Sequence, residues 1–280
     1  ITGATISGNG KMAADAVLFN GGATYTSTQF LSYSPLSAGA NKLLVPRFVR
    51  NYHAFQSGLE IQNVGSAPTS ATVTFSFGGS TYVTNTGTIN PGATWVKYAP
   101  CCIPELAPVD SLPQPQRFGS AVIQAAPGGL IAAIVNEDNR AQCNGVSGCT
   151  FDSANQEGWA ATYDAIPDGS QTNTVFIAEY MNHVGSPDFN SGFQVSNTTG
   201  LAGTCNITYT GAPAANESGV TLAANGAISR NAANVPSLPS GFDNSVIVNC
   251  TQPIIGIYNY SARSTSYFGD SEGAANATNQ

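Results

Sequence analysis

The sequence predicts an all-β protein built from two tandem antiparallel β-sandwiches, of immunoglobulin-like or jelly-roll type, with an N-terminal extension strand. Three observations lead to this fold class. Short segments alternate apolar and polar side chains, Gly- and Asn-rich turn signals separate these segments, and the second half of the chain repeats the first. Alternation with a period of two marks strands that bury one face. No segment sustains a helical period for long, so we expect little helix.

The composition excludes several classes of protein. Only 9% of the 280 residues are charged and 42% are hydrophobic, whereas ordinary domains carry about 25% charged residues. Intrinsic disorder requires low hydrophobicity with high net charge, so it is excluded. A formal net charge of -7 argues against binding a phosphate backbone, which needs clustered Lys and Arg. No window approaches the ~18 consecutive apolar residues of a membrane helix.

Internal repetition defines the predicted architecture. Residues 57–63 (SGLEIQN) recur as 191–197 (SGFQVSN), and the same offset of 134 relates 71–75 to 205–209. Further matches, at offsets between 123 and 130, are Val45 with Val175, His53 with His183, Phe118 with Phe242, and 131–136 with 254–259. Repetition over about ninety residues indicates a tandem duplication.

The duplication sets the predicted domain boundaries. We expect an N-terminal extension over residues 1–40, a first sandwich module over 41–170, and a second module with a C-terminal tail over 171–280. The first module carries a Cys-bearing insertion at 141–160 that the second module lacks.

A third, partial copy precedes the first module. Residues 16–20 (AVLFN) resemble the closing strand of each module, and a Ser/Thr-Tyr phrase follows at Ser32, Thr162 and Ser266. One interpretation is that the extension packs on the first sandwich as an edge strand or cap. The other is that it docks on a neighbouring subunit, because an open strand edge is a template for pairing. The predicted assembly residues are then Val17, Phe19 and Tyr25.

Six cysteines in a chain of low charge indicate disulfides and an oxidising compartment. Cys205 opens one strand and Cys250 closes another, which predicts a bridge between the two sheets of the second module. Cys101, Cys102, Cys143 and Cys149 are expected to staple the first module and its insertion, with their pairing left open. Candidate N-glycosylation sequons begin at Asn197, Asn206, Asn216, Asn249, Asn259 and Asn276.

The repeated pattern, S-G-apolar-x-apolar-x-N followed by N-P-G-A, S-L-P and an apolar strand ending in Asn, resembles β-sandwich modules strung in tandem in secreted and cell-surface proteins of bacteria. The resemblance spans about residues 40–275. It implies an extracellular structural or adhesive role and supplies no catalytic residues.

Residues that could carry chemistry are sparse. There is no G-x-S-x-G motif, and His53 and His183 look like repeat-inherited loop residues. A pair of carboxylates for glycoside hydrolysis could come from Glu137, Asp138, Glu157, Asp164 and Asp168, but we expect these acids to lie in solvated loops. Residues 137–139 could supply oxygen ligands to Ca²⁺, but they lack the usual spacing of a Ca²⁺-binding loop. We therefore expect no catalytic residue, no cofactor and no metal. An aromatic sugar platform would draw on Trp95, Tyr98, Trp159 and Tyr163.

These observations predict a structural subunit of an extracellular polymer, a filament or surface layer at the cell surface, that assembles by strand addition through its N-terminal extension. Its partners would be copies of itself and, in addition, glycans, with no nucleic acid and no membrane. The alternative is a secreted carbohydrate-binding or adhesive module. An enzyme ranks third, and a viral coat protein of paired sandwiches is also compatible with the pattern.

Overall fold

The computed structural model describes residues 16–20, 29–33, 39–52, 55–138, 160–185, 188–262 and 272–279. The all-β prediction is confirmed, because strands dominate and every helix is short. The chain divides into two compact units, residues 1–168 and 169–280, close to the boundary expected from the repeat. None of the described helices is long and apolar enough to cross a membrane.

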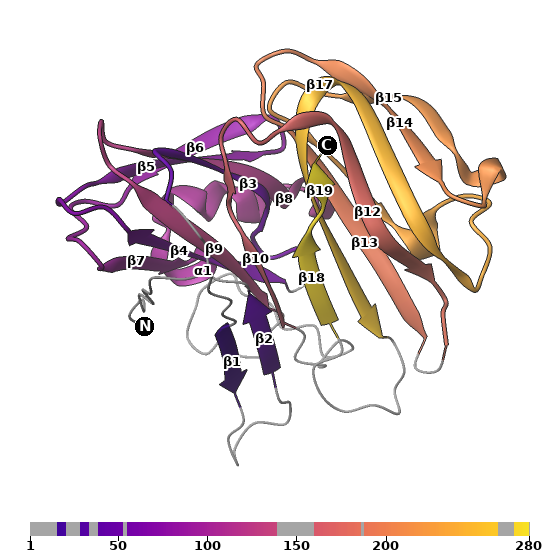
Figure 1. Cartoon of the computed structure of the whole chain (residues 1–280), viewed down its shortest axis with the longest axis horizontal. Coiled ribbons are helices and arrows are strands. Elements are labelled where there is room, and N and C mark those ends of the chain that lie inside the picture. The colour runs from indigo at the N-terminus through magenta and orange to yellow at the C-terminus, as the bar shows by residue number, and fades with distance from the viewer. Residues whose placement is uncertain are drawn as a thin grey trace, which may run out of the picture. The chain divides into compact units, whose positions relative to one another are not determined.

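Unit 1 contains a two-stranded sheet and a sandwich of two larger sheets (Figure 1). The sandwich sheets have the strand orders β10-β9-β4-β7 and β11-β3-β8-β5-β6. The strands of the unit are β1 (Ala16–Asn20), β2 (Gln29–Tyr33), β3 (Lys42–Val49), β4 (Gln56–Asn63), β5 (Ala71–Phe77), β6 (Ser80–Asn85), β7 (Thr94–Tyr98), β8 (Phe118–Ala125), β9 (Ile131–Asp138), β10 (Ala160–Asp164) and β11 (Ile166–Pro167).

Unit 2 forms its two layers around one long strand, β17. The first half of β17 pairs with β12 and β14, and its second half pairs with β13 and β18. The strands of the unit are β12 (Thr172–Asn182), β13 (Phe189–Asn197), β14 (Gly203–Tyr209), β15 (Glu217–Leu222), β16 (Ala227–Asn231), β17 (Phe242–Ala262), β18 (Glu272–Asn276) and β19 (Thr278–Asn279).

Helices serve as short connections in both units. Each described helix is three to eight residues long and lies between strands. Two of them, η1 and η3, start at Pro, whose fixed φ suits a first helical residue. They are α1 (Ala99–Cys102) and the 3₁₀ helices η1 (Pro104–Ser111), η2 (Gln114–Gln116), η3 (Pro213–Ala215) and η4 (Ala232–Asn234).

The two units share one topology, strand for strand. The order β11-β3-β8-β5-β6 of unit 1 corresponds to β19-β12-β17-β14-β15, and β10-β9-β4-β7 corresponds to β18-β17-β13-β16. Residue pairing follows the same correspondence, since Val73 pairs with Ile123 in unit 1 and Ile207 with Val248 in unit 2. The duplication read from the sequence is therefore present in the hydrogen-bonding pattern as well.

The pairing corrects three of the predicted equivalences. Val45 pairs with Ala121 and Ile177 pairs with Val246 at the same place in the two ladders, so Val45 corresponds to Ile177 and not to Val175. In β8, Ile123 corresponds to Val248 of β17, because Val73 and Ile207 are their equivalent partners. The sequence offset between β8 and β17 is therefore one residue longer than the predicted match of Phe118 with Phe242 implies. His183 corresponds to Asn51, not to His53, because each has a positive φ and each donates its amide N–H to a side-chain oxygen, of Asn190 and Gln56 respectively. The two histidines are therefore not equivalent, and His53 lies outside the described residues.

Aromatic side chains at equivalent positions fill both cores. In unit 1, β5 alternates buried and half-buried residues along its whole length, and its Phe75 ring packs 4.8 Å from Phe48. In unit 2, Tyr209 packs 5.9 Å from Tyr180 at the matching place. All four are almost completely buried. Burial of each large apolar side chain contributes about 1.5–3 kcal/mol to stability, so these positions determine which face of each strand points inward.

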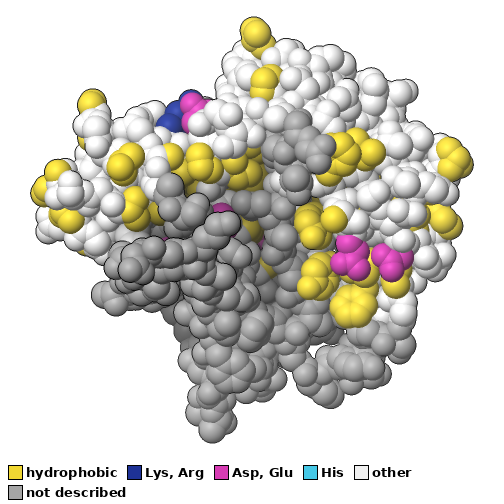
Figure 2. Space-filling model, in the orientation of Figure 1, with side chains coloured by type: hydrophobic (Ala, Val, Ile, Leu, Met, Phe, Trp, Pro, Cys, Tyr) yellow, Lys and Arg dark blue, Asp and Glu magenta, His cyan; other side chains and the backbone are white. Residues whose placement is uncertain are grey.

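Neutral side chains cover most of the described part of the face seen in Figure 2. Figure 2 shows charged side chains only in small groups on the visible face, with neutral polar and apolar side chains between them. Exposed apolar side chains among the described residues include Leu201 at 67% and Val83 at 48%, and Val64 and Leu130 lie beside each other, with the N–H of Val64 donating to the carbonyl oxygen of Leu130 at 3.0 Å.

Candidate functional site

Two of the three predicted assembly residues lie in a hairpin. Val17 and Phe19 belong to β1, which pairs antiparallel with β2, and Tyr25 lies outside the described residues. The surplus strand expected from the sequence is therefore paired within its own chain. β2 contacts β10, so the hairpin adjoins the β10 edge of unit 1. Within the described residues, β1 pairs with no strand other than β2.

The Ser/Thr-Tyr phrases of the two units, at Thr162 and Ser266, do not occupy equivalent positions in the structure. Thr162 pairs with Asn136 in unit 1, and the matching residue in unit 2 is Ala274, which pairs with Asn259. Ser266, the predicted match, is eight residues earlier and lies outside the described residues. Unit 2 therefore contains its own closing strands β18 and β19 and is complete as a sandwich.

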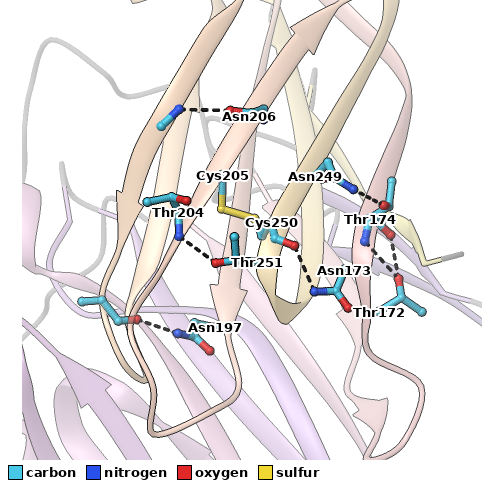
Figure 3. Close-up of a disulfide and its surroundings, with 12 residues drawn as sticks. Thr172, Asn173, Thr174, Asn197, Thr204, Cys205, Asn206, Asn249, Cys250 and Thr251 are labelled. Atoms are coloured by element: carbon cyan, nitrogen blue, oxygen red, sulfur yellow. Dashed lines mark hydrogen bonds between the residues drawn. A yellow bond between two sulfur atoms is a disulfide. The ribbon is translucent and has the colours of Figure 1, made fainter.

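The predicted bond between Cys205 and Cys250 is confirmed, but its predicted placement between two sheets is wrong. Cys205 and Cys250 form a disulfide, but they face each other on neighbouring strands β14 and β17, so the bond joins two strands of one sheet and does not bridge the sheets (Figure 3). Cys101 and Cys102 bond to each other at the end of α1. Cys143 and Cys149 lie outside the described residues, as does most of the predicted insertion.

The candidate glycosylation sites separate by exposure. Asn197 is 2% exposed, and its Nδ2 donates to the carbonyl oxygens of Leu201 and Ala223 at 2.7 and 2.9 Å. A glycan cannot be attached to an amide nitrogen held this way, so Asn197 is not a glycosylation site in the folded protein. Asn206, Asn216 and Asn249 are exposed and Asn259 is half-buried, whereas Asn276 lies in β18 with its side chain outside the described set. Nδ2 of Asn249 donates to Thr174 (Figure 3).

Three of the candidate acids are bound by other side chains. Glu137 is 4% exposed and accepts two hydrogen bonds from Arg47, at 2.6 and 2.8 Å. Asp138 follows it on β9, so its side chain points to the opposite face and accepts a hydrogen bond from Tyr98. Asp168 pairs with Lys42. Glu157 lies outside the described residues.

Asp164, the remaining candidate acid, sits in a partly desolvated place at the end of β10. Burial raises its pKa to about 6, because a low-dielectric environment disfavours the charged carboxylate. Among the described residues, no three His, Cys, Asp or Glu side chains converge as a metal site would require.

The predicted aromatic platform is not assembled. Trp95 and Tyr98 are three residues apart on β7, so their side chains point to opposite faces of the sheet. Tyr163 is 3% exposed, and its hydroxyl donates to the backbone oxygen of Arg47. Trp159 lies outside the described residues. The described members of the set therefore offer no common surface on which a sugar ring could stack.

The sequence did not predict the structural role of one pair of equivalent residues. Asn63 and Asn197 end the repeated motif in the two units, and both are buried. Nδ2 of Asn63 donates to the carbonyl oxygens of Ala67 and Ile89 at 2.8 Å, the same pattern that Asn197 makes in unit 2. An identical Asn at the end of both copies was the available signal, but the sequon pattern at Asn197 suggested a surface role.

The described residues thus leave strand edges, and not a pocket of convergent side chains, as the candidate functional feature. No protein-family model and no curated protein matches the chain. Among solved structures, the chain is similar to Thermotoga maritima 1070 at 15% sequence identity and a TM-score of 0.32, over 46% of this chain and 96% of that one. A similarity at this level carries no argument about function.

Proposed function

We propose that the protein is a structural subunit of an extracellular polymer, a filament or surface layer, whose copies join by strand addition through the N-terminal extension. The observation that carries the proposal is the β1–β2 hairpin. Its inner strand contacts β10, and its outer strand β1 has one edge that no described strand occupies. Unpaired N–H and C=O groups along such an edge are a template for another chain.

The surface supports association of identical copies. A chain with 9% charged residues experiences little like-charge repulsion when copies approach each other. Polar uncharged side chains keep the remaining faces hydrated. Two sandwiches of the same topology in one chain also suit a subunit whose role is to extend a structure.

The disulfides support an extracellular location. Cys205–Cys250 and Cys101–Cys102 are bonded pairs, and disulfides form and persist chiefly outside the reducing cytosol. Those same compartments contain surface layers and filaments.

Charge substitution in the hairpin tests the proposal. Val17→Asp combined with Phe19→Asp places two carboxylates on β1, and we expect polymers seen by electron microscopy of the native protein to disappear. Thr204→Asp with Thr208→Asp adds the same charge at two exposed positions of β14 and should leave polymers intact. A deletion of residues 1–31 should act like the hairpin variant. Polymers of undiminished length in both N-terminal variants would refute the proposal.

A further inference from the structure

Strand β6 is an edge strand whose outer backbone edge pairs with no described strand, although the connecting helix η1 contacts it. It pairs with β5 on one side and is the last strand of its sheet. Among the described residues, no backbone hydrogen bond reaches its other side. The six residues of β6 include no charged residue and no Pro, which are the usual devices that prevent edge pairing.

The alternation of hydrogen-bonded pairs between β5 and β6 shows which backbone groups of β6 point away from β5. Thr86 donates its N–H to the carbonyl oxygen of Ala71 at 2.9 Å, so this is a hydrogen-bonded pair of the antiparallel ladder. Because such pairs alternate with non-hydrogen-bonded ones, the N–H and C=O of Val83 point away from β5. The Val83 side chain, which stands on a face of the sheet, is 48% exposed.

The equivalent strand of unit 2 is guarded. β15 carries a β-bulge opposite Asn206, where Gly219 adopts a φ of 65° and donates its N–H to the Asn206 side chain. Glu217, at the start of the strand, forms an ion pair of 2.6 Å with Arg230. A bulge and charges at an edge both disfavour strand addition. The duplication thus provides one open and one closed version of the same edge.

The open edge and the hairpin lie on opposite sides of unit 1. β2 contacts β10, which continues directly into β11, whereas β6 is at the other end of the order β11-β3-β8-β5-β6. A chain therefore cannot pair its own β1 with its own β6. A contact between these two edges must join different copies, and because the surfaces differ it propagates head to tail and not into a closed pair.

We propose that β6 is the acceptor edge, and that its occupant is β1 of a second copy of this chain. The two strands have five and six residues and neither carries a charge. Pairing edge to edge would keep both hairpins intact and extend the five-stranded sheet by two strands. The inference rests on the proposed function, for which it names the receiving surface.

Substitutions at Val83 in the full-length chain test the acceptor. Val83→Pro removes one outward N–H without removing a bond to β5, as Pro is tolerated at such edge positions. Val83→Lys adds an edge charge and leaves the backbone unchanged, in case the Pro variant does not fold. We expect either variant to reduce the sedimenting polymer fraction at least ten-fold. The matched control is Thr221→Pro on the guarded edge β15, where Thr221 is exposed, and it should polymerise like the native protein.

A labelled peptide of residues 14–22 separates this inference from the proposed function. Its binding to dilute, monomeric full-length protein is followed by fluorescence anisotropy. We expect binding to the native protein and to Thr221→Pro, and at least ten-fold weaker binding to the Val83 variants. If the native protein binds the peptide in this way but never polymerises, the proposed function fails and the acceptor site stands. Undiminished polymers in both Val83 variants, or no β6-dependent peptide binding, would overturn the acceptor site.

Discussion

Removal of the buried Asn63 side chain should destabilise unit 1 strongly. Its amide makes three hydrogen bonds, donating to Ala67 and Ile89 at 2.8 Å and accepting from the N–H of Gly65 at 2.9 Å. Asn63→Ala removes all three bonds in a place where the side chain is fully buried, although the carbonyl oxygen of Ile89 still accepts from the N–H of Thr69. At about 1 kcal/mol for each bond, the free energy of unfolding should fall by about 3 kcal/mol.

Tryptophan fluorescence provides a unit-specific assay for this change. Both tryptophans, Trp95 and Trp159, belong to unit 1, so the urea transition that they report is that of unit 1. With a slope of about 2 kcal/mol per molar urea, the midpoint should fall by about 1.5 M. The control is Asn85→Ala, an exposed residue whose Oδ1 accepts one hydrogen bond from Thr72, and it should shift the midpoint by less than about 0.3 M. A shift for Asn63→Ala no larger than that of the control would refute the reasoning.

Three further outcomes are expected. Replacing both Cys205 and Cys250, which close a separation of 45 residues, should lower the stability of unit 2 by about 2–4 kcal/mol, measured by calorimetry against the native protein. Asp164→Asn should raise the stability of unit 1 at pH 7 to 8 and flatten its pH dependence between about 4 and 6. The reason is that the raised pKa of Asp164, about 6, makes the native protein lose stability as the pH rises through that range, and chemical denaturation at several pH values would detect the difference. Expression in an N-glycosylating host should modify the exposed Asn206 and leave the buried Asn197 unmodified, and peptide mass spectrometry would contradict this assignment if it found glycan at Asn197.

The sequence predicted the fold class because alternation is a direct consequence of strand geometry. Where burial enforces the pattern, as in β5 and its counterpart β14, the offset of 134 holds residue for residue in the hydrogen-bonded pairing. The positions of Cys205 and Cys250 at the ends of two predicted strands were also sufficient to predict that these cysteines bond. The alternation did not show that the two cysteines face each other within one sheet, because alternation assigns a residue to a face of its strand and does not tell which strands are neighbours.

Some predicted residue matches between the two units were wrong. They were wrong where the two units share a backbone conformation but carry different side chains. Asn51 and His183 both have φ near 50° and both donate an N–H to an amide oxygen. Since Asn and His are both enriched at positive φ, the residue type can change while the turn persists. Matching the letters of His53 and His183 therefore gave an offset two residues too short.

The candidate site was predicted only in part, for a related reason. The sequence identified a surplus strand at residues 16–20 and a Ser/Thr-Tyr phrase at Ser32, but it did not predict that these two segments pair as β1 and β2. The open edge of β6 was not predicted at all. Which strand lies at the end of a sheet is a property of topology, and only the comparison with the bulged β15 distinguishes an edge that is guarded from one that is not.

β17 gives unit 2 a mechanical property that unit 1 lacks. Its 21 residues form one backbone that belongs to both layers, whereas in unit 1 the same path is interrupted by the turn between β8 and β9. Layers joined by a turn can slide apart by peeling one sheet from the other. In unit 2, a pull that separates the layers must load a continuous covalent strand, together with hydrogen bonds to four neighbours at once. We therefore expect the two layers of unit 2 to open as one cooperative element, whereas in unit 1 the turn between β8 and β9 separates the pairing of the two layers.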